Sequence, residues 1–380
     1  MADHLWSADE TRHQSFNPTR LTLARERNGL TKQQLADASQ VTRRAVTAWE
    51  AGEVENPPTA VLARILGFPD LFFYADDPVP ISKDGVSFRA LKSMSARQLN
   101  RVLAASSLAI EFSTWMDSNY TTPVPNLPDL SDSQSLEPVV AAESVRSIWG
   151  AHQAAVRNLL LLLEEKGIRV FSLPVSDREV DAFSFWHEDR PFIFLDTART
   201  SERMRFDLAH ELGHLLLHRQ TRSLRSRNVE QQAQDFASSF LMPADALYAQ
   251  VKGQLRFEDV FELKRFWRVS AVAMVQRLWH LSIISDWHYR TWMIELSRRG
   301  FRTSEPGGIH PESSRLYREL FKLAREDGWS VRRIALALHI PERELDGMVF
   351  GLAIAPAPPD TPAIGTTTGD QELGHLSRAK

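Results

Sequence analysis

Apolar residues recur at the spacing of an α-helix over most of the chain. This spacing predicts short helices over 16–75 and one longer helix over 95–119, for which Ser95 is the expected cap. A further helix through VRNLLLLLEEKG is expected to end at Gly167, because glycine readily takes the left-handed conformation that closes a helix.

Three short apolar runs interrupt the helical spacing and predict strands. They read IRVFSL, AFSFW and FIFLD, and they lie between Gly167 and Thr200. Helical spacing returns after Thr200 and dominates 229–300 and 313–350. The whole pattern predicts a helix-rich α+β fold.

Proline-rich stretches divide the chain. They fall at 55–60, at 121–138 and after 355, where Pro, Gly, Thr and Ala occur without periodic apolar residues and predict disorder. The expected parts are a flexible N-terminus at 1–15, an all-helical domain at 16–80, a linker helix with a proline-rich connection at 81–137, an α+β domain at 138–300, a helical module at 301–352 and a disordered tail at 353–380.

Composition narrows the chemistry and the compartment. The 380 residues are 43% apolar and 24% charged, enough for two or three domains with their own cores. With 45 basic and 48 acidic residues, the net charge of −3 confines any nucleic-acid contact to a local patch. The chain has no cysteine, so a metal would need histidine and carboxylate ligands. No apolar run has the length of a signal peptide or a membrane span, so we expect a cytoplasmic protein without membrane contact.

Residues 29–52, GLTKQQLADASQVTRRAVTAWEAG, have the layout of a helix-turn-helix. Thr31 can cap the first helix, Val41 closes the turn and Thr42 can cap the second helix. Ala45, Val46 and Trp49 would then face the core, and the opposite face would meet DNA. The candidate DNA-binding residues are Gln33, Thr42, Arg43, Arg44 and Thr47. The competing interpretation is a helical hairpin with solvated arginines.

The run from NPTRLTLARERNGLT through AWEAG to LGFPDLFF resembles the XRE family of helix-turn-helix proteins almost end to end. The resemblance implies that this part of the chain binds a DNA operator. If the domain is a homodimer, its operator should be a palindrome with half-sites about one helical turn apart.

A second motif, FDLAHELGHLLLH at 206–218, carries histidines four residues apart. Residues at this spacing share one face of a helix, so His210 and His214 can bind one zinc ion while Glu211 serves as the base toward a water. The competing interpretation is a buried apolar helix with incidental polar residues, because the motif is short.

Zinc needs a third ligand from the protein. His218 continues the face by another turn, but three consecutive turns spread the imidazoles over about 12 Å, too far to share one ion. Glu230 is the better candidate because a second helix, EQQAQDFASSFLMP, can bring it in from another direction. We expect His218 and Asp235 to lie around the ligands instead.

The motif AHELGHLLLH, followed by E-x-x-A-x-x-F-A-x-x-F-L-M-P, resembles the ImmA/IrrE metallopeptidases. The resemblance implies a zincin-like domain in which His210, His214 and Glu230 bind Zn²⁺ and Glu211 is catalytic. It also implies that AFSFW is the strand along which a substrate backbone lies. One departure is Gln234, a position where family members often carry Asn or Asp. The resemblance therefore does not predict which residues surround the ligands.

Residues 328–351 align without gaps on 29–52, so the helix-turn-helix layout recurs near the end of the chain. The second copy carries Glu342, Glu344 and Asp346 where a DNA reader needs basic residues. We therefore expect a packing or dimerisation module.

Together these features predict a DNA-binding regulator with a zinc endopeptidase domain. By resemblance, its substrate is a helix-turn-helix repressor, cleaved in response to stress or mobile-element signals. Two alternatives stay open, namely a transcription factor that senses a ligand or partner without proteolysis and a component of a toxin-antitoxin-like system.

Overall fold

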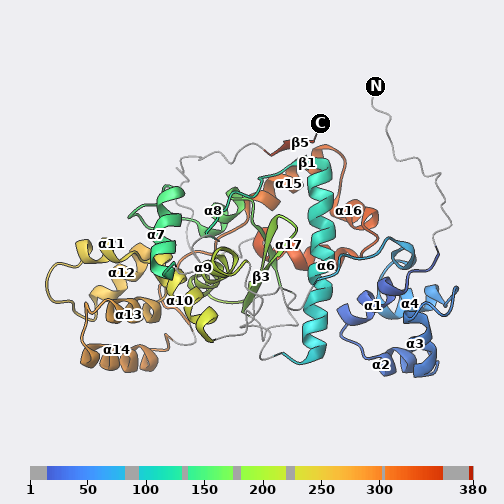
Figure 1. Ribbon diagram of the computed structural model, residues 1–380, viewed down its shortest axis with the longest axis horizontal. Coiled ribbons are helices and arrows are strands. Elements are labelled where there is room, and N and C mark those ends of the chain that lie inside the picture. Colours follow the sequence, from blue (N-terminus) through green and yellow to red (C-terminus); the bar gives the residue numbers. More distant parts are fainter. Residues whose placement is uncertain are drawn as a thin grey trace. The chain divides into compact units, whose positions relative to one another are not determined.

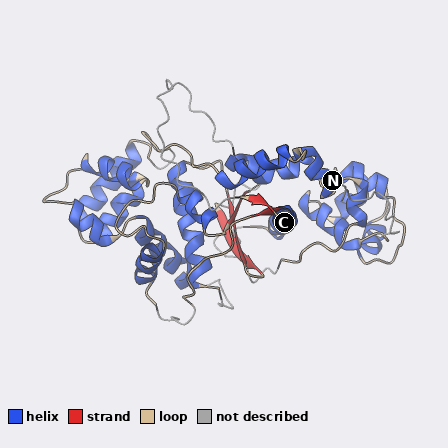
Figure 2. Ribbon diagram, turned by 90° about the horizontal axis from the view of Figure 1, so that it is seen from above, coloured by secondary structure: helices blue, strands red, loops and turns tan. Residues whose placement is uncertain are grey.

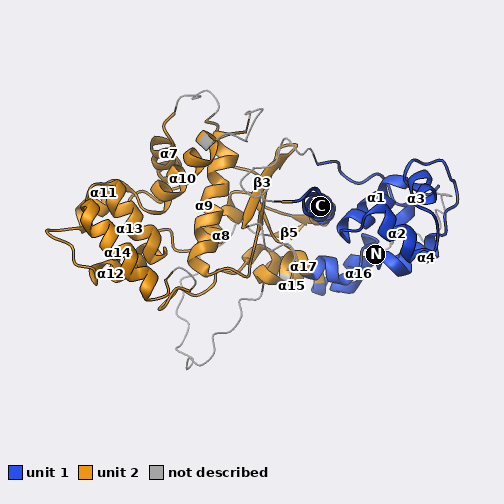
Figure 3. Ribbon diagram, turned by 90° about the horizontal axis from the view of Figure 1, so that it is seen from below, with its two compact units in different colours: residues 1–81, 95–115, 325–346 blue, residues 82–94, 116–324, 347–380 orange. Residues whose placement is uncertain are grey.

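The computed structural model describes residues 15–81, 94–130, 136–173, 181–219, 227–301, 304–353 and 376–379 (Figure 1). The chain forms two compact units. Unit 1 comprises residues 1–81, 95–115 and 325–346, and unit 2 comprises 82–94, 116–324 and 347–380 (Figure 3). Helices make up most of both units, as Figure 2 shows, in agreement with the helix-rich α+β expectation.

Unit 1 begins with the helices expected before residue 75. They are α1 (Pro18–Arg27), α2 (Lys32–Ala38), α3 (Arg43–Glu50), α4 (Thr59–Leu66) and the 3₁₀ helix η1 (Asp70–Tyr74). The expected long helix is α6 (Ala96–Asn119), and the Ser95 hydroxyl accepts a hydrogen bond from the Gln98 amide at 3.3 Å. Unit 1 also contains α16 (Val331–Ala337) and the start of α17 (Glu342–Ala353).

The second repeat packs within unit 1. Glu344, buried at the start of α17, forms an ion pair with Arg27 of α1 at 2.7 Å. The preceding residue, Arg343, donates hydrogen bonds to the carbonyls of Leu66 and Gly67, at the C-terminal end of α4. An acidic residue that is unsuited to DNA thus has a basic partner inside the protein.

Unit 2 contains a sheet of three strands in the order β2-β4-β3. Its strands are β2 (Arg169–Ser172), β3 (Ala182–His187) and β4 (Arg190–Leu195). β4 is parallel to β2 and antiparallel to β3, so β3 forms one edge. The rings of Phe183 and Phe194 stack with centroids 4.8 Å apart and give the sheet an aromatic core. The three expected strands are confirmed.

Unit 2 also contains nine helices among its described residues. They are α7 (Pro138–Ile148), α8 (Leu159–Glu165), α9 (Ser201–Leu217), α10 (Arg227–Leu241), α11 (Ala244–Gln250), α12 (Asp259–Trp267), α13 (Ala271–His280), α14 (Asp286–Arg298) and α15 (Arg315–Glu326). Of these, α8 and α9 pack against the sheet. α8 begins later than VRNLLLLLEEKG suggests, because Asn158 caps it by accepting from the Leu161 amide at 2.9 Å. It ends before Gly167, as expected.

Two carboxylates hold α8 against the segment that leads into α15. Glu312 accepts hydrogen bonds from the first amides of α8, Leu159 at 3.0 Å and Leu160 at 2.9 Å. In return, Glu164 near the end of α8 accepts from the amides of Arg315 and Leu316, both at 3.1 Å. Each helix N-terminus thereby gains an acceptor for two of its first amides.

Short β-pairing joins the end of the chain to unit 2. Ser377–Arg378 form β5, which pairs antiparallel with β1 (Tyr120–Thr121). The expectation of disorder after residue 353 does not fit these residues, because backbone hydrogen bonds such as Ala379 N to Asn119 O at 3.0 Å need no apolar side chain. The rest of the tail and residues 1–14 lie outside the described residues.

The same helix-helix turn occurs four times among the described residues. In each case a left-handed residue with φ between 53° and 57° precedes an apolar residue whose amide donates to a carbonyl five residues earlier. The pairs are Gln40 and Val41, Arg268 and Val269, Ser282 and Ile283, and His339 and Ile340. Two of these turns belong to the aligned repeats, and the other two, on either side of α13, were not predicted.

Candidate metal centre and DNA interface

The α9 helix carries the His-Glu-x-x-His motif and is buried along most of its length. Its cap is Thr200, whose hydroxyl accepts a hydrogen bond from the Arg203 amide at 3.3 Å. α9 packs against β3, β4 and α10. The contact with α10 is close at Gly213, where an added Cβ would lie 3.3 Å from Ala233 Cα. A small residue within the motif therefore lets the next helix approach the histidines.

His210, His214 and Glu230 converge on one point. The two histidine Nε2 atoms lie 3.1 Å apart, and each lies 3.5 Å from an oxygen of the Glu230 carboxylate. Four-coordinate zinc with bonds near 2 Å places neighbouring ligand atoms about 3.3 Å apart. The three side chains have the spacing that such an ion requires.

The Glu230 carboxylate has no hydrogen-bond donor among the described residues, and both of its oxygens are buried. A buried carboxylate with no donor is costly. Two imidazoles and one carboxylate form a ligand set typical of catalytic zinc, which leaves one position for water or substrate. The residues present fit Zn²⁺.

Glu211 is almost fully buried, and a residue of the sheet holds it by a hydrogen bond. The Ser184 hydroxyl of β3 donates a hydrogen bond of 2.6 Å to Glu211 Oε2. Ser184, which lies between Phe183 and Phe185, thus helps to orient the carboxylate beside the candidate metal ligands. Sequence reasoning missed Ser184, although a single hydroxyl in the apolar run AFSFW was a visible signal.

His218, the last residue of the motif, lies behind His214. The Nδ1 atoms of the two rings are 3.1 Å apart, and His218 Nε2 lies 3.0 Å from the Gln232 amide oxygen. If His214 offers Nε2 to a metal, its Nδ1 proton can be donated to His218, which donates in turn to Gln232. Burial lowers the pKa of His218 and favours the neutral ring that this chain of bonds needs.

The remaining expected neighbour, Asp235, accepts a hydrogen bond from Gln231 at 2.9 Å on its own helix. Gln234 lines a cavity instead, together with Phe206 of α9. Beyond the end of α9, the Arg219 guanidinium lies 4.0 Å above the ring of Trp186 on β3. The structure brings together the three candidate ligands, Glu211 and His218, and it leaves Asp235 with Gln231.

In unit 1, α2 and α3 form the expected helix-turn-helix. Thr31 and Thr42 cap the two helices, and Val46 and Trp49 are buried. The five candidate DNA-binding residues are exposed, and Gln33 Nε2 donates to Asp37 at 2.7 Å. Neither Arg43 nor Arg44 forms an ion pair with any described residue, so both guanidinium groups are available for phosphates or bases.

Comparison with known families separates the same two regions. Residues 21–70 match the family model of the helix-turn-helix, and residues 163–279 match that of the IrrE N-terminal-like domain. The chain therefore joins an XRE-type helix-turn-helix to an ImmA/IrrE-like metallopeptidase domain, as its motifs predict. The candidate ligands and Glu211 all fall within the second match. None of the curated proteins compared matches the chain.

Proposed function

We propose that this protein is a cytoplasmic DNA-binding regulator whose second unit is a zinc-dependent endopeptidase. The observation that carries the proposal is the convergence of His210, His214 and Glu230 beside a Glu211 carboxylate that Ser184 holds in place. Bound zinc would polarise a peptide carbonyl and lower the pKa of a water toward neutrality.

The residues of the chain account for the remaining chemistry. The Glu211 carboxylate accepts the proton of the attacking water and returns it to the leaving amine. Ser184 orients Glu211, while His218 orients the His214 ring. The β3 strand, at the edge of the sheet, supplies backbone groups for an extended peptide substrate.

The helix-turn-helix of unit 1 would bind an operator through Arg43 and Arg44. The substrate that the ImmA/IrrE resemblance favours is a helix-turn-helix repressor, cleaved in response to stress or a mobile-element signal. Among the described residues, no helix is long and apolar enough to cross a membrane.

Metal content tests the ligand set before any substrate is known. Purified protein should hold close to one zinc ion per chain, as measured by inductively coupled plasma mass spectrometry. The Glu230→Gln variant should lose this zinc on dialysis. Glu143→Gln, at an exposed position of α7, is the matched control and should keep its zinc. Native protein that retains no zinc would contradict the enzyme proposal and favour a regulator that does not cut.

A further inference from the structure

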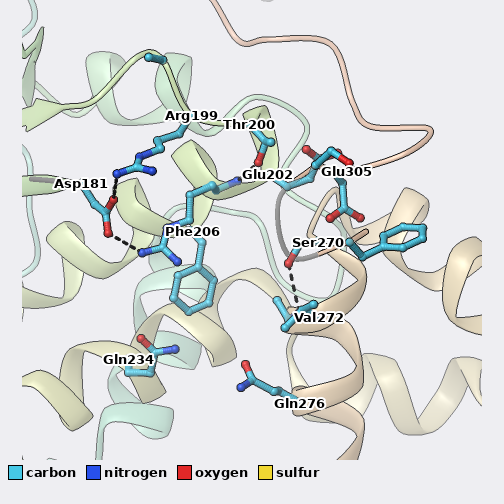
Figure 4. A pocket seen from close by; sticks show the side chains of 15 residues that line it. Asp181, Arg199, Thr200, Glu202, Phe206, Gln234, Ser270, Val272, Gln276 and Glu305 are labelled. Carbon is cyan, nitrogen blue, oxygen red and sulfur yellow. Dashed lines mark hydrogen bonds and ion pairs between the residues drawn. The ribbon is translucent and has the colours of Figure 1, made fainter. Parts of the chain in front are cut away.

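A cavity of about 660 Å³ lies in unit 2 between α9, α10 and α13 (Figure 4). Its walls include Phe206 of α9, Gln234 of α10, and Val272 and Gln276 of α13. All these side chains are half-buried, so each presents part of its surface to the cavity. The volume suits a large amino-acid side chain together with adjoining backbone.

Two residues of the cavity wall share helix faces with the candidate metal ligands. Phe206 precedes His210 by one helical turn, and Gln234 follows Glu230 by one turn, so each lies on the face of its helix that carries the ligand. Four residues correspond to about 6 Å along the axis. Asp181, also in the cavity wall, directly precedes β3 and comes three residues before Ser184. The cavity wall therefore contains residues close in the chain to two candidate ligands and to the strand where a peptide would lie.

Most charged groups of the wall already have ionic partners. Arg199 and Arg203 both pair with Asp181, at 2.9 Å and 2.7 Å. Glu305 pairs with Lys264 at 2.7 Å, whereas Glu202 accepts from the Ile309 amide at 2.7 Å. An acidic ligand group would have to displace Asp181 from an arginine.

The amides of Gln234 and Gln276 make no hydrogen bond to the described residues. They adjoin the apolar surfaces of Phe206, Val272 and Phe301. An amide can both donate and accept, so the pair can satisfy a hydroxyl or amide at the tip of a large apolar side chain. The turn before α13, which repeats that of the helix-turn-helix, brings Gln276 to this wall.

We propose that this cavity is the subsite that selects the substrate residue flanking the cleaved bond, and that it takes a large uncharged side chain with a polar tip, tyrosine above all. The proposal rests on the proposed peptidase function, because it places the substrate backbone along β3. An acidic side chain is disfavoured because both arginines of the described wall already pair with Asp181.

Peptide hydroxamates provide a test that does not depend on turnover, because the hydroxamate group binds zinc. Four probes that differ only in one side chain (tyrosine, phenylalanine, lysine and glutamate) are titrated by calorimetry into the zinc-loaded full chain. Tyrosine should bind about tenfold more tightly than phenylalanine, since one hydrogen bond to the glutamines distinguishes them. The tyrosine probe should also bind more tightly than the lysine and glutamate probes.

The double variant Gln234→Leu with Gln276→Leu should abolish the preference for tyrosine over phenylalanine while zinc content stays unchanged. Gln231→Leu, an exposed amide on the same helix, is the control and should keep the preference. Equal binding of all probes, binding of none, or a preference unaffected by the double variant would overturn the subsite.

The two proposals fail in different ways. Selective binding without cleavage of any peptide would support the subsite and contradict the peptidase function. Cleavage with unselective binding would support the peptidase function and overturn the subsite.

Discussion

At the scale of single residues, the Ser184 hydroxyl is a contact that helps to orient Glu211. It reaches the carboxylate from β3 across the interface with α9. Because a general base must point at the proton that it removes, a freely rotating Glu211 would spend less time in the productive position. Ser184 is therefore a positioning residue under the proposed mechanism.

Ser184→Ala should lower kcat about tenfold and leave KM and zinc content unchanged, because the hydroxyl touches Glu211 and not the substrate. Steady-state kinetics and metal analysis measure the effect. Ser239→Ala is a matched control, since the Ser239 hydroxyl is buried without a hydrogen-bond partner among the described residues. An equal loss of kcat in both variants would remove Ser184 from the mechanism.

Glu164 makes folding depend on pH. Burial, opposed by hydrogen bonds from Ser314 and two backbone amides, raises its pKa to about 7 from an ordinary 4.5. A raised pKa means that its contribution to stability is fully present below pH 4.5 and is lost as the pH rises through 7.

Glu164→Gln should remove this dependence. We compare the free energy of unfolding of the native protein with that of the variant. The native protein should gain about 3 kcal/mol relative to the variant when the pH falls from above 8 to 4.5. Urea unfolding at the two pH values measures it. A difference that does not change with pH would show that Glu164 is not buried as a carboxylic acid.

At the scale of elements, the sequence predicted most helices and all three strands of the larger sheet. Helix caps such as Thr200 and the periodicity of α9 are local signals, so they can be read from a few residues. The turn between α12 and α13 was missed because Arg268 takes a left-handed conformation without being glycine. β5 was missed because its backbone pairing leaves no mark in the side chains.

The exposed face of α3 gives a prediction for DNA. Replacing Arg43 and Arg44 with alanine should weaken operator binding at least tenfold and reduce its dependence on salt, because fewer phosphate counterions are released. Fluorescence anisotropy across a salt series measures both. Arg332→Ala, an exposed arginine of α16, should leave binding unchanged. Unaltered binding by the Arg43 and Arg44 variant would exclude those residues from the interface.

The second repeat gives a prediction about packing. If it acts as a packing module, the Arg27 and Glu344 side chains should stabilise each other across α1 and α17. A double-mutant cycle with Arg27→Ala and Glu344→Ala should give a coupling energy of about 1–3 kcal/mol in urea unfolding. Zero coupling, or direct contact of the second repeat with DNA in crosslinking, would contradict the packing role.

At the scale of the whole molecule, the domain boundaries were harder to foresee than the site. The three candidate zinc ligands could be predicted because His210 and His214 lie four residues apart on α9 and Glu230 lies on the helix that follows. The compact units combine segments far apart in the chain, since residues 325–346 cluster with the N-terminal helices. Such packing depends on pairs like Glu344 and Arg27, which no local pattern connects.

The central claim is that one chain contains both a DNA reader and a working zinc peptidase. The most direct measurement incubates the zinc-loaded protein with a helix-turn-helix repressor encoded beside it and follows cleavage by mass spectrometry of the intact proteins. The native protein should cut the repressor at one site, whereas Glu211→Gln should hold the same amount of zinc and cut nothing. A repressor left intact by the native protein, or cut equally by Glu211→Gln, would contradict the account.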